Sequence, residues 1–219
     1  ARAAPWLAPG VVVAVVDPGV GTGRRAVAVD SGAGIAFIGP DNGLLLPAVG
    51  RLGGPTRAVE LSALPRPPAA GELGAVPGGP TFDGRDRFAP AGAHLAAGGA
   101  FDELGPAVEP ASLVRLAFTE ARASRAGTAG VVDAEVWWVD RFGNAELNAG
   151  AELVAGWGER LALWIDAAPE PRRLRRVRAF ADLGADEVGL LVDSQGRLAI
   201  VANLASAAGR LGLTAGSRV

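Results

Sequence analysis

The sequence has 219 residues, of which 49% are hydrophobic, and a formal net charge of −2, so it can bury a core and has no overall charge that favours nucleic acid. Cysteine is absent and His94 is the single histidine, which excludes disulfides, thiolate metal sites and histidine-cluster metal sites. No apolar run reaches the length of a membrane span, and no signal-peptide pattern is present. We therefore expect a cytoplasmic protein with no bound metal and no membrane or nucleic-acid partner.

The first half of the chain predicts an α/β domain. The β-branched run Val11–Val16 is typical of a buried strand in a sheet covered on both faces, and Ala26–Asp30 and Ile35–Ile38 predict two more strands. Residues 51–80 are rich in glycine and proline and predict an irregular connection. Ala89–Gly98 predicts a helix that ends at Gly98. We expect a mixed or parallel sheet with flanking helices.

Short strands and turns predominate in the second half and predict a small β-rich domain. The predicted strands are Val131–Val139, Trp157–Ile165, Arg175–Phe180, Val188–Val192 and Leu198–Val201. The Arg-rich stretch at 172–178 has no matching basic patch elsewhere, so we interpret it as a solvated strand face. The predicted boundary lies near residue 128, with one domain over residues 1–128 and the other over 129–219.

A glycine-rich loop, Gly19–Gly23, follows the first predicted strand. A phosphate-binding loop has to open a helix, but this one runs into the strand-like Ala26–Asp30, so we reject that interpretation. Asp17 stands at the end of the strand, where ligand crevices of α/β sheets form, and Arg24 or Arg25 can fold back toward it. Taken alone, this pattern is better explained by a turn-capping aspartate beside an exposed arginine, since surface ion pairs are common and weak.

Three later segments also combine charged, aromatic and turn residues. Thr81–Pro90 packs charges between two phenylalanines before a helix, Asp140–Asn144 follows a strand of bulky residues, and Ser194–Asn203 begins with a turn. Each has a simple structural interpretation as a helix entry or a hairpin turn.

Together with Val15–Gly21 and Gly39–Gly43, and in this order, these segments resemble the SAM hydroxide adenosyltransferase family, which is related to the fluorinase and chlorinase enzymes. The resemblance runs from about residue 8 to the end of the chain. It implies that the protein cleaves S-adenosyl-L-methionine (SAM) with water to adenosine and methionine, without a cofactor. It also implies an N-terminal α/β domain, a C-terminal β-barrel-like domain, and a homotrimer that holds SAM between the N-terminal domain of one subunit and the C-terminal domain of its neighbour.

The resemblance also implies roles for single residues. Asp17 and Arg24 match the pair that holds and polarises water, and Asp83 stands where the hydrolytic members usually have His, so we expect it to act as proton acceptor or water anchor. The substrate-binding candidates are Phe82 and Gly84 beside ribose C5′, Asp140 at the methionine amino group, Ser194 at its carboxylate, Asn144, Phe180 and Leu204 at adenine, and Phe142 within the same turn as Asn144.

The chain departs from the family pattern in places besides Asp83. Gln195 and Ala202 stand where the fluorinase carries arginines, and residues 1–10 contain no counterpart of the family's first strand, whose Asp grips the ribose hydroxyls. The sequence also has no methionine, so we expect an upstream segment.

Two alternative functions remain open. One is a halogenase acting on the same substrate, although the fluorinase has Ser where Gly84 stands and a charged Asp17 should repel a halide. The other is a non-catalytic protein that binds SAM or adenosine.

Overall fold

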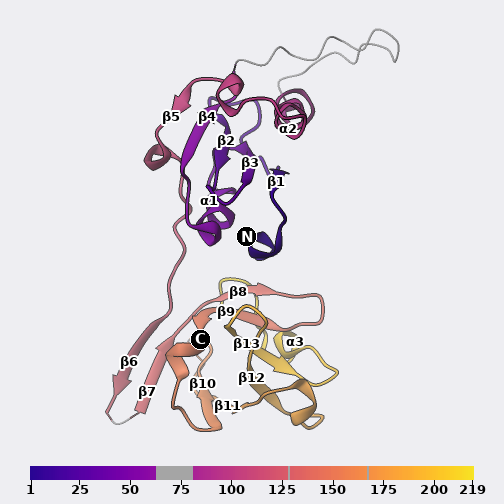
Figure 1. Ribbon diagram of the computed structural model, residues 1–219. Coiled ribbons are helices and arrows are strands. Elements are labelled where there is room, and N and C mark those ends of the chain that lie inside the picture. Colours follow the sequence, from indigo (N-terminus) through magenta and orange to yellow (C-terminus); the bar gives the residue numbers. More distant parts are fainter. Residues whose placement is uncertain (63–80, 128, 167) are drawn as a thin grey trace. The chain divides into compact units, whose positions relative to one another are not determined.

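The computed structural model describes residues 1–62, 81–127, 129–166 and 168–219 (Figure 1). The chain separates into two compact units, Ala1–Ala117 and Phe118–Val219. The boundary predicted near residue 128 falls between β6 (Arg122–Ala126) and β7 (Ala129–Asp133), which pair as an antiparallel hairpin within the second unit. Because hairpin partners stay together, the two units divide before this hairpin begins.

The first unit is built on a five-stranded sheet in the order β1-β3-β2-β4-β5. Its strands are β1 (Gly10–Val13), β2 (Ala26–Asp30), β3 (Ile35–Pro40), β4 (Arg57–Glu60) and β5 (Ala107–Val108). β1 runs parallel to β3 and the other pairs are antiparallel, so the sheet is mixed.

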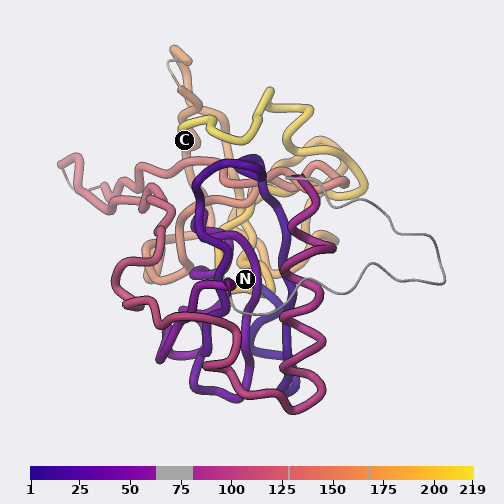
Figure 2. The backbone as a smooth tube through the Cα atoms, turned by 90° about the horizontal axis from the view of Figure 1, so that it is seen from above, coloured from indigo at the N-terminus to yellow at the C-terminus, as the bar shows by residue number. Residues whose placement is uncertain are grey.

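Helices cover both faces of this sheet. On one face, Ile38 packs with Phe88 and with α2 (Ala89–Ala96). On the other face, Phe37 packs with Val49 of α1 (Leu46–Val49). Figure 2 shows the coil of α2 running beside the indigo strands. The α/β fold with flanking helices is therefore confirmed for this unit.

Two predictions for the first unit are wrong in detail. β1 ends at Val13 and is an edge strand, so Val15 and Val16 leave the sheet and are exposed. The region predicted to be irregular contains β4, whose pairing with β2 is a long-range contact that local composition does not reveal. The remainder of that predicted connection, 63–80, lies outside the described residues.

The second unit holds a six-stranded sheet in the order β10-β11-β12-β13-β9-β8, and the β6–β7 hairpin forms a separate sheet. Its strands are β8 (Val136–Val139), β9 (Ala145–Gly150), β10 (Arg160–Leu163), β11 (Arg172–Arg176), β12 (Val188–Val192) and β13 (Arg197–Ala202), followed by α3 (Ala207–Leu211). β10 and β8 end the series, so among the described residues the sheet does not close, and the barrel-like part of the prediction is not confirmed.

Strand β9 was not predicted, although it is among the most buried strands of the unit. Its apolar residues Ala145, Leu147 and Ala149 alternate with the polar Glu146 and Asn148, a period of two that is typical of a strand, so this strand could have been predicted from the sequence. Asn148 replaces apolar packing with hydrogen bonds: its Oδ1 accepts from Glu135 N at 2.8 Å and its Nδ2 donates to Thr119 O at 3.0 Å.

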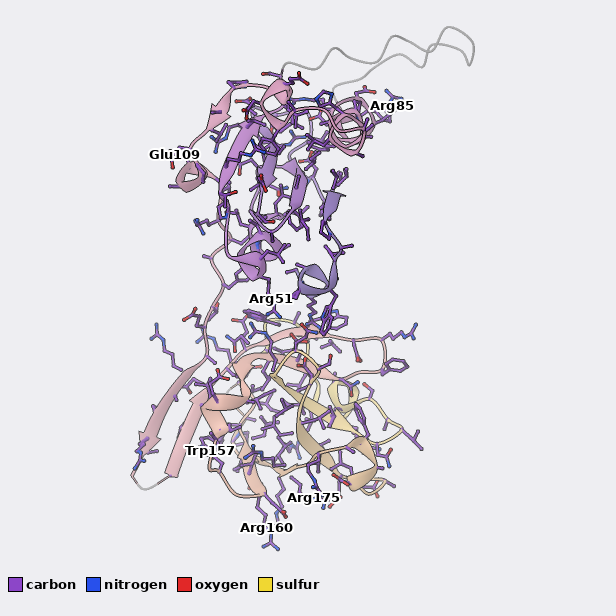
Figure 3. All side chains as sticks on the ribbon, viewed as in Figure 1. Arg51, Arg85, Glu109, Trp157, Arg160 and Arg175 are labelled. Atoms are coloured by element: carbon purple, nitrogen blue, oxygen red, sulfur yellow. The ribbon has the colours of Figure 1, made fainter. Side chains whose placement is uncertain are left out.

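The Arg-rich stretch forms β11. Arg175 lies opposite Arg160 of β10, and both side chains are marked in Figure 3. Arg175 Nη2 donates to Glu187 Oε2 at 3.1 Å, while Arg172 and Arg173 are exposed. This agrees with the solvated strand face expected from the sequence. No helix in the described part of the chain is long and apolar enough to cross a membrane.

Candidate active site

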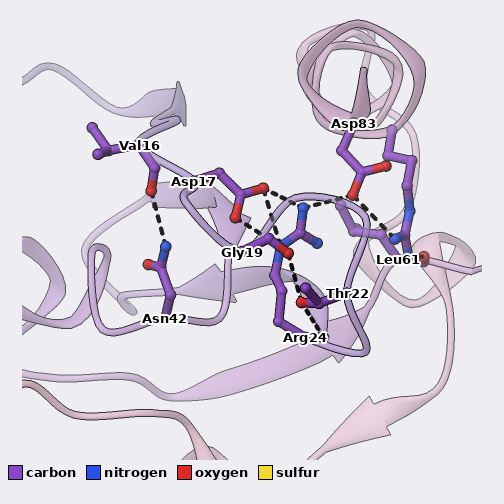
Figure 4. Close-up of polar contacts among 9 residues, drawn as sticks. Val16, Asp17, Gly19, Thr22, Arg24, Asn42, Leu61 and Asp83 are labelled. Atoms are coloured by element: carbon purple, nitrogen blue, oxygen red, sulfur yellow. Dashed lines mark hydrogen bonds and ion pairs between the residues drawn. The ribbon is translucent and has the colours of Figure 1, made fainter. Parts of the chain in front are cut away.

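The loop after β1 places Asp17 and Arg24 face to face. Beyond β1 the chain is held by Asn42, whose Nδ2 donates to Val16 O at 2.9 Å. The loop then folds tightly, because Thr22 Oγ1 donates to Gly19 O at 2.6 Å, and it leads directly into β2 (Figure 4). As predicted, this glycine-rich loop is followed by a strand. The loop therefore does not open a helix whose N-terminus could bind a phosphate.

Arg24 binds two carboxylates from segments far apart in the sequence. Its Nε donates to Asp17 Oδ1 at 2.9 Å and to Oδ2 at 3.0 Å, and its Nη2 also contacts Asp17 Oδ2. The same Nη2 donates to Asp83 Oδ2 at 2.6 Å (Figure 4). The side chains of Asp17, Arg24 and Asp83 are only 5%, 10% and 16% exposed. The structure thus brings together the three residues predicted to be catalytic.

A π-helical turn delivers Asp83 to this cluster. The turn spans Gly84–Phe88 and continues directly into α2. Pro90 has no N–H to donate to the preceding turn and its ring crowds the carbonyl four residues back, which favours a wider turn here. Asp83 immediately precedes the turn, and the centre of the buried Phe88 ring lies 5.4 Å from the Arg24 guanidinium carbon. Single π turns in helices are rare and often occur at functional sites.

Arg24 is a permanent cation in this setting. The hydrogen bond from its guanidinium to Asp17 raises the pKa of Arg24 above its usual value, burial opposes this rise, and the hydrogen bond to Asp83 adds to it. The site can therefore offer a fixed positive charge and two carboxylates to a small polar molecule.

Arg25, the other arginine that the sequence offered as a partner for Asp17, has a different role. Its Nε donates to Oδ2 of the buried Asp41 at 2.8 Å, and its Nη2 donates to Ser112 O at 2.7 Å. Asp41 also accepts from Val114 N at 2.8 Å. This network ties β3 to the last segment of the unit.

Replacing Arg25 with methionine should therefore lower stability. We expect the free energy of unfolding to fall by about 2 kcal/mol, because the variant leaves the buried Asp41 carboxylate without its cation. Partial solvation of Arg25 keeps this loss below that of a fully buried ion pair. Chemical denaturation of Arg25→Met beside wild type measures this loss. An unchanged denaturation midpoint would show that the Arg25–Asp41 pair is only a surface contact.

In the second unit, the predicted Asp140–Asn144 segment is a compact turn. Asp140 Oδ1 accepts from the backbone N–H groups of Phe142 and Asn144, each at 2.9 Å, and its Oδ2 accepts from Asn144 Nδ2 at 2.9 Å. Gly143 has φ of +84° and packs so closely on Ser206 that a Cβ would clash with it. Only glycine meets both demands, so the turn is fixed against the start of α3.

The charge of Asp140 is part of this turn. Burial acts to raise the pKa of Asp140, but the hydrogen bonds from Asn144, Phe142 and Gly143 outweigh it and hold the pKa below the usual value. A carboxyl whose pKa is lowered by folding contributes stability that is fully present above its unfolded pKa and is lost as the pH falls through the folded value.

We therefore expect Asp140→Asn to destabilise the protein at pH 7 by about 1–3 kcal/mol, the cost of losing a hydrogen-bonded charge. The difference between variant and wild type should shrink as the pH is lowered below about 4, near the ordinary pKa of an aspartate. Urea denaturation of both proteins between pH 3 and pH 7 tests this. A difference that does not depend on pH would mean that the carboxylate charge plays no part.

The other substrate-binding candidates divide into two sets. Asn144 precedes β9 and Leu204 follows β13, and these strand ends are neighbours because Ala145 pairs with Ile200. Phe180 joins them through its own short helical turn, where Leu183 O accepts from Asn203 Nδ2 at 3.1 Å. Ser194 instead lies in the turn at the opposite end of β13. Its predicted contact with the methionine carboxylate stays a prediction.

Several of these candidates expose apolar side chains. Phe82 of the first unit is 52% exposed, and in the second unit Phe142 is 63%, Phe180 42% and Leu204 101% exposed. Leu204 also has φ of +51°, an uncommon conformation for a leucine. These four side chains are therefore accessible to a ligand.

Sequence reasoning missed two members of the site. Arg87 Nη1 lies 3.5 Å from Asp83 Oδ2, and Asn42 holds the chain next to Asp17. Arg87 could have been found from its place four residues after Asp83 in a helical segment, where such side chains are neighbours. Among the described residues, no group of three or more metal-binding side chains gathers.

Comparison with known proteins decides the family. The sequence model of the SAM hydroxide adenosyltransferase N-terminal domain matches residues 1–105, and that of the corresponding C-terminal domain matches residues 134–219. The chain belongs to the SAM hydroxide adenosyltransferase family. This confirms the resemblance inferred from the five sequence segments.

Relatives within and beside this family are similar over most of the chain. A protein of Salinispora tropica named (R)-S-adenosyl-L-methionine hydrolase is 42% identical, over 100% of this chain and 77% of that protein. A fluorinase of Actinopolyspora mzabensis is 34% identical over 78% of this chain and 56% of its own length. The crystal structure of a conserved protein from Thermotoga maritima superposes with a TM-score of 0.80 and 29% identity, over 99% of this chain and 78% of that one.

Proposed function

We propose that this SAM hydroxide adenosyltransferase hydrolyses SAM to adenosine and L-methionine. The observation that carries the proposal is the nearly buried Asp17–Arg24–Asp83 cluster, in a chain whose relatives are named SAM hydrolases. Similarity to these relatives over the whole of the given sequence supports the reaction, and the cluster supplies the groups that water attack requires.

In the reaction, a water oxygen forms a bond to ribose C5′ while the bond from C5′ to the sulfonium sulfur breaks. The sulfur keeps the electron pair and leaves as the neutral thioether of methionine, and the water loses a proton. Charge is dispersed or neutralised as a hydroxide-like nucleophile meets a cationic centre, so a dry site favours the transition state. Alignment of water with the C–S bond supplies much of the remaining acceleration.

The three side chains divide this work. Both carboxylate oxygens of Asp17 accept from Arg24, which fixes the direction of the guanidinium. Arg24 Nη1 and Asp83 Oδ1 have no hydrogen-bond partner in the described part of the chain, so the first can donate to the water oxygen and the second can accept its proton. Free water has a pKa of about 15.7, so stabilisation of developing hydroxide by Arg24 has to accompany this transfer.

The second unit is proposed to bind the two ends of SAM. Asp140 carries a negative charge suited to the methionine amino group, and Asn144 has an amide suited to adenine. Phe142, Phe180 and Leu204 offer apolar surface beside them, as Phe82 does in the first unit. We propose that a homotrimer in the cytoplasm brings the N-terminal unit of one subunit to the C-terminal unit of the next, which would cover this surface. Analytical ultracentrifugation with and without SAM tests the trimer.

Incubation with SAM followed by chromatography tests the function: adenosine and methionine should appear in equal amounts. Repeating the incubation with fluoride and with chloride addresses the relationship to the fluorinase. We expect no halogenated nucleoside, because two carboxylates beside the nucleophile position oppose a halide. Calorimetric binding of SAM without turnover would instead support a non-catalytic binding protein.

A further inference from the structure

A second arginine lies beside the catalytic cluster and is held by the sheet. Arg87 Nη2 donates to Leu61 O at 2.6 Å, while its Nη1 lies 3.5 Å from Asp83 Oδ2. Leu61 is itself buried and fixed, because its N–H donates to Ala26 O at 2.7 Å. The Arg87 side chain is 36% exposed, yet its Nη2 is held by the backbone carbonyl of Leu61, just beyond β4. The position of the Arg87 guanidinium is therefore fixed by a hydrogen bond to the backbone.

The charges of the cluster explain why a second arginine matters. Asp17 and Asp83 both accept from Arg24, so two carboxylates share one guanidinium in a place that is largely shielded from water. Like charges in such surroundings resist simultaneous ionisation. Arg87 supplies the second positive charge, and the four side chains form a balanced alternating row from Asp17 through Arg24 and Asp83 to Arg87.

We propose that Arg87 is a positioning residue for Asp83. It neutralises this carboxylate and, together with Arg24, binds its Oδ2, which leaves Oδ1 to accept from the attacking water. Arg87 reaches Asp83 and the Leu61 carbonyl and acts on the reaction through Asp83. The inference rests on the proposed hydrolysis of SAM, since the water attack is what Asp83 would serve.

A double-mutant cycle tests this role. The proteins are wild type, Arg87→Met, Asp83→Asn and the double variant. For each, kcat and KM for SAM are measured from adenosine release under excess SAM, and slow variants are also measured in a single turnover with excess enzyme. We expect Arg87→Met to lower kcat about tenfold and to change KM less than about twofold, and the same change to cost less than about twofold when Asp83 is already Asn. Arg87→Lys keeps the charge but loses the fork that also binds Leu61 O, so its kcat should fall between those of wild type and Arg87→Met.

Arg57→Met is the matched control, because Arg57 forms an Arg–Asp pair with Asp30 in the same unit and away from the cluster. It should leave kcat unchanged. An equal loss from Arg87→Met with and without Asp83, or no loss in an active protein, would overturn the role of Arg87 alone. Failure of the wild-type chain to release adenosine would instead overturn the proposed function, and this inference with it. The midpoints of chemical denaturation of the same four proteins measure the coupling between Arg87 and Asp83 independently of activity.

Discussion

Replacing Arg24 with methionine is expected to lower kcat for adenosine release by about 10³-fold, the upper range for removing one transition-state hydrogen-bond donor. The change removes the only group that contacts both Asp17 and Asp83 among the described residues. It takes away the cation that is proposed to stabilise developing hydroxide, and it leaves two carboxylates facing each other. The second defect should disorder the position of the water, because the two carboxylates repel each other.

Chromatography of adenosine after incubation with SAM measures this loss, with thermal unfolding used to choose a temperature at which every variant is folded. The adjacent Arg25→Met is the natural comparison, because Arg25 binds Asp41 and Ser112 and no group of the cluster. We expect Arg24→Met to lose activity and Arg25→Met to lose stability. An Arg24→Met enzyme with near-normal kcat would remove the guanidinium from the mechanism.

Replacing Asp83 with alanine should lower kcat by about 10²-fold, the usual contribution of a positioned proton acceptor. The water would then lack an acceptor, although Asp17 and Arg24 would still hold each other. Asp83→His is the informative companion, because the resemblance implies that hydrolytic members usually have His at this position. A neutral imidazole nitrogen can accept a proton as a carboxylate does, so this variant should retain most of the activity.

The two outcomes have different consequences. An unchanged rate in Asp83→Ala would exclude Asp83 from the chemistry and leave water binding to Asp17 and Arg24. A loss in Asp83→Ala together with an equal loss in Asp83→His would show that this chain has adapted to a carboxylate, which the nearby Arg87 would explain. KM for SAM should change little in either case, since Asp83 is proposed to contact water and not the substrate.

Much of the site could be predicted from sequence because its parts are local. Asp17 and Arg24 belong to one tight loop, so their meeting needs only seven residues of chain and the glycines between them. The Asp140–Asn144 turn is equally local, and its Asp, Gly and Asn are the residues that such a turn requires. Asp83 is 59 residues from Arg24, and it was included only through the family resemblance.

Other features depend on contacts that local sequence does not encode. The run Val11–Val16 has the composition of a central strand, yet β1 is an edge strand that ends at Val13, because strand order is set by tertiary pairing. Arg24 and Arg25 lie next to each other just before β2, and the partner of each is decided by where folding places the carboxylates, with Asp83 near Arg24 and Asp41 near Arg25. The role proposed for Arg87 depends on the hydrogen bond that it donates to the Leu61 carbonyl, a contact that local sequence does not indicate.

The sequence by itself therefore predicted the family, the α/β and β-rich halves, and the three residues that meet in the Asp17–Arg24–Asp83 cluster, since these follow from short segments in a fixed order. The tertiary structure decided which carboxylates share Arg24, that the second sheet stays open among the described residues, and that Ser194 and Leu204 lie at opposite ends of β13. The physical reason is the range of the forces involved. Turn and strand preferences act over a few residues, whereas strand pairing and charge clusters join segments that only folding brings together.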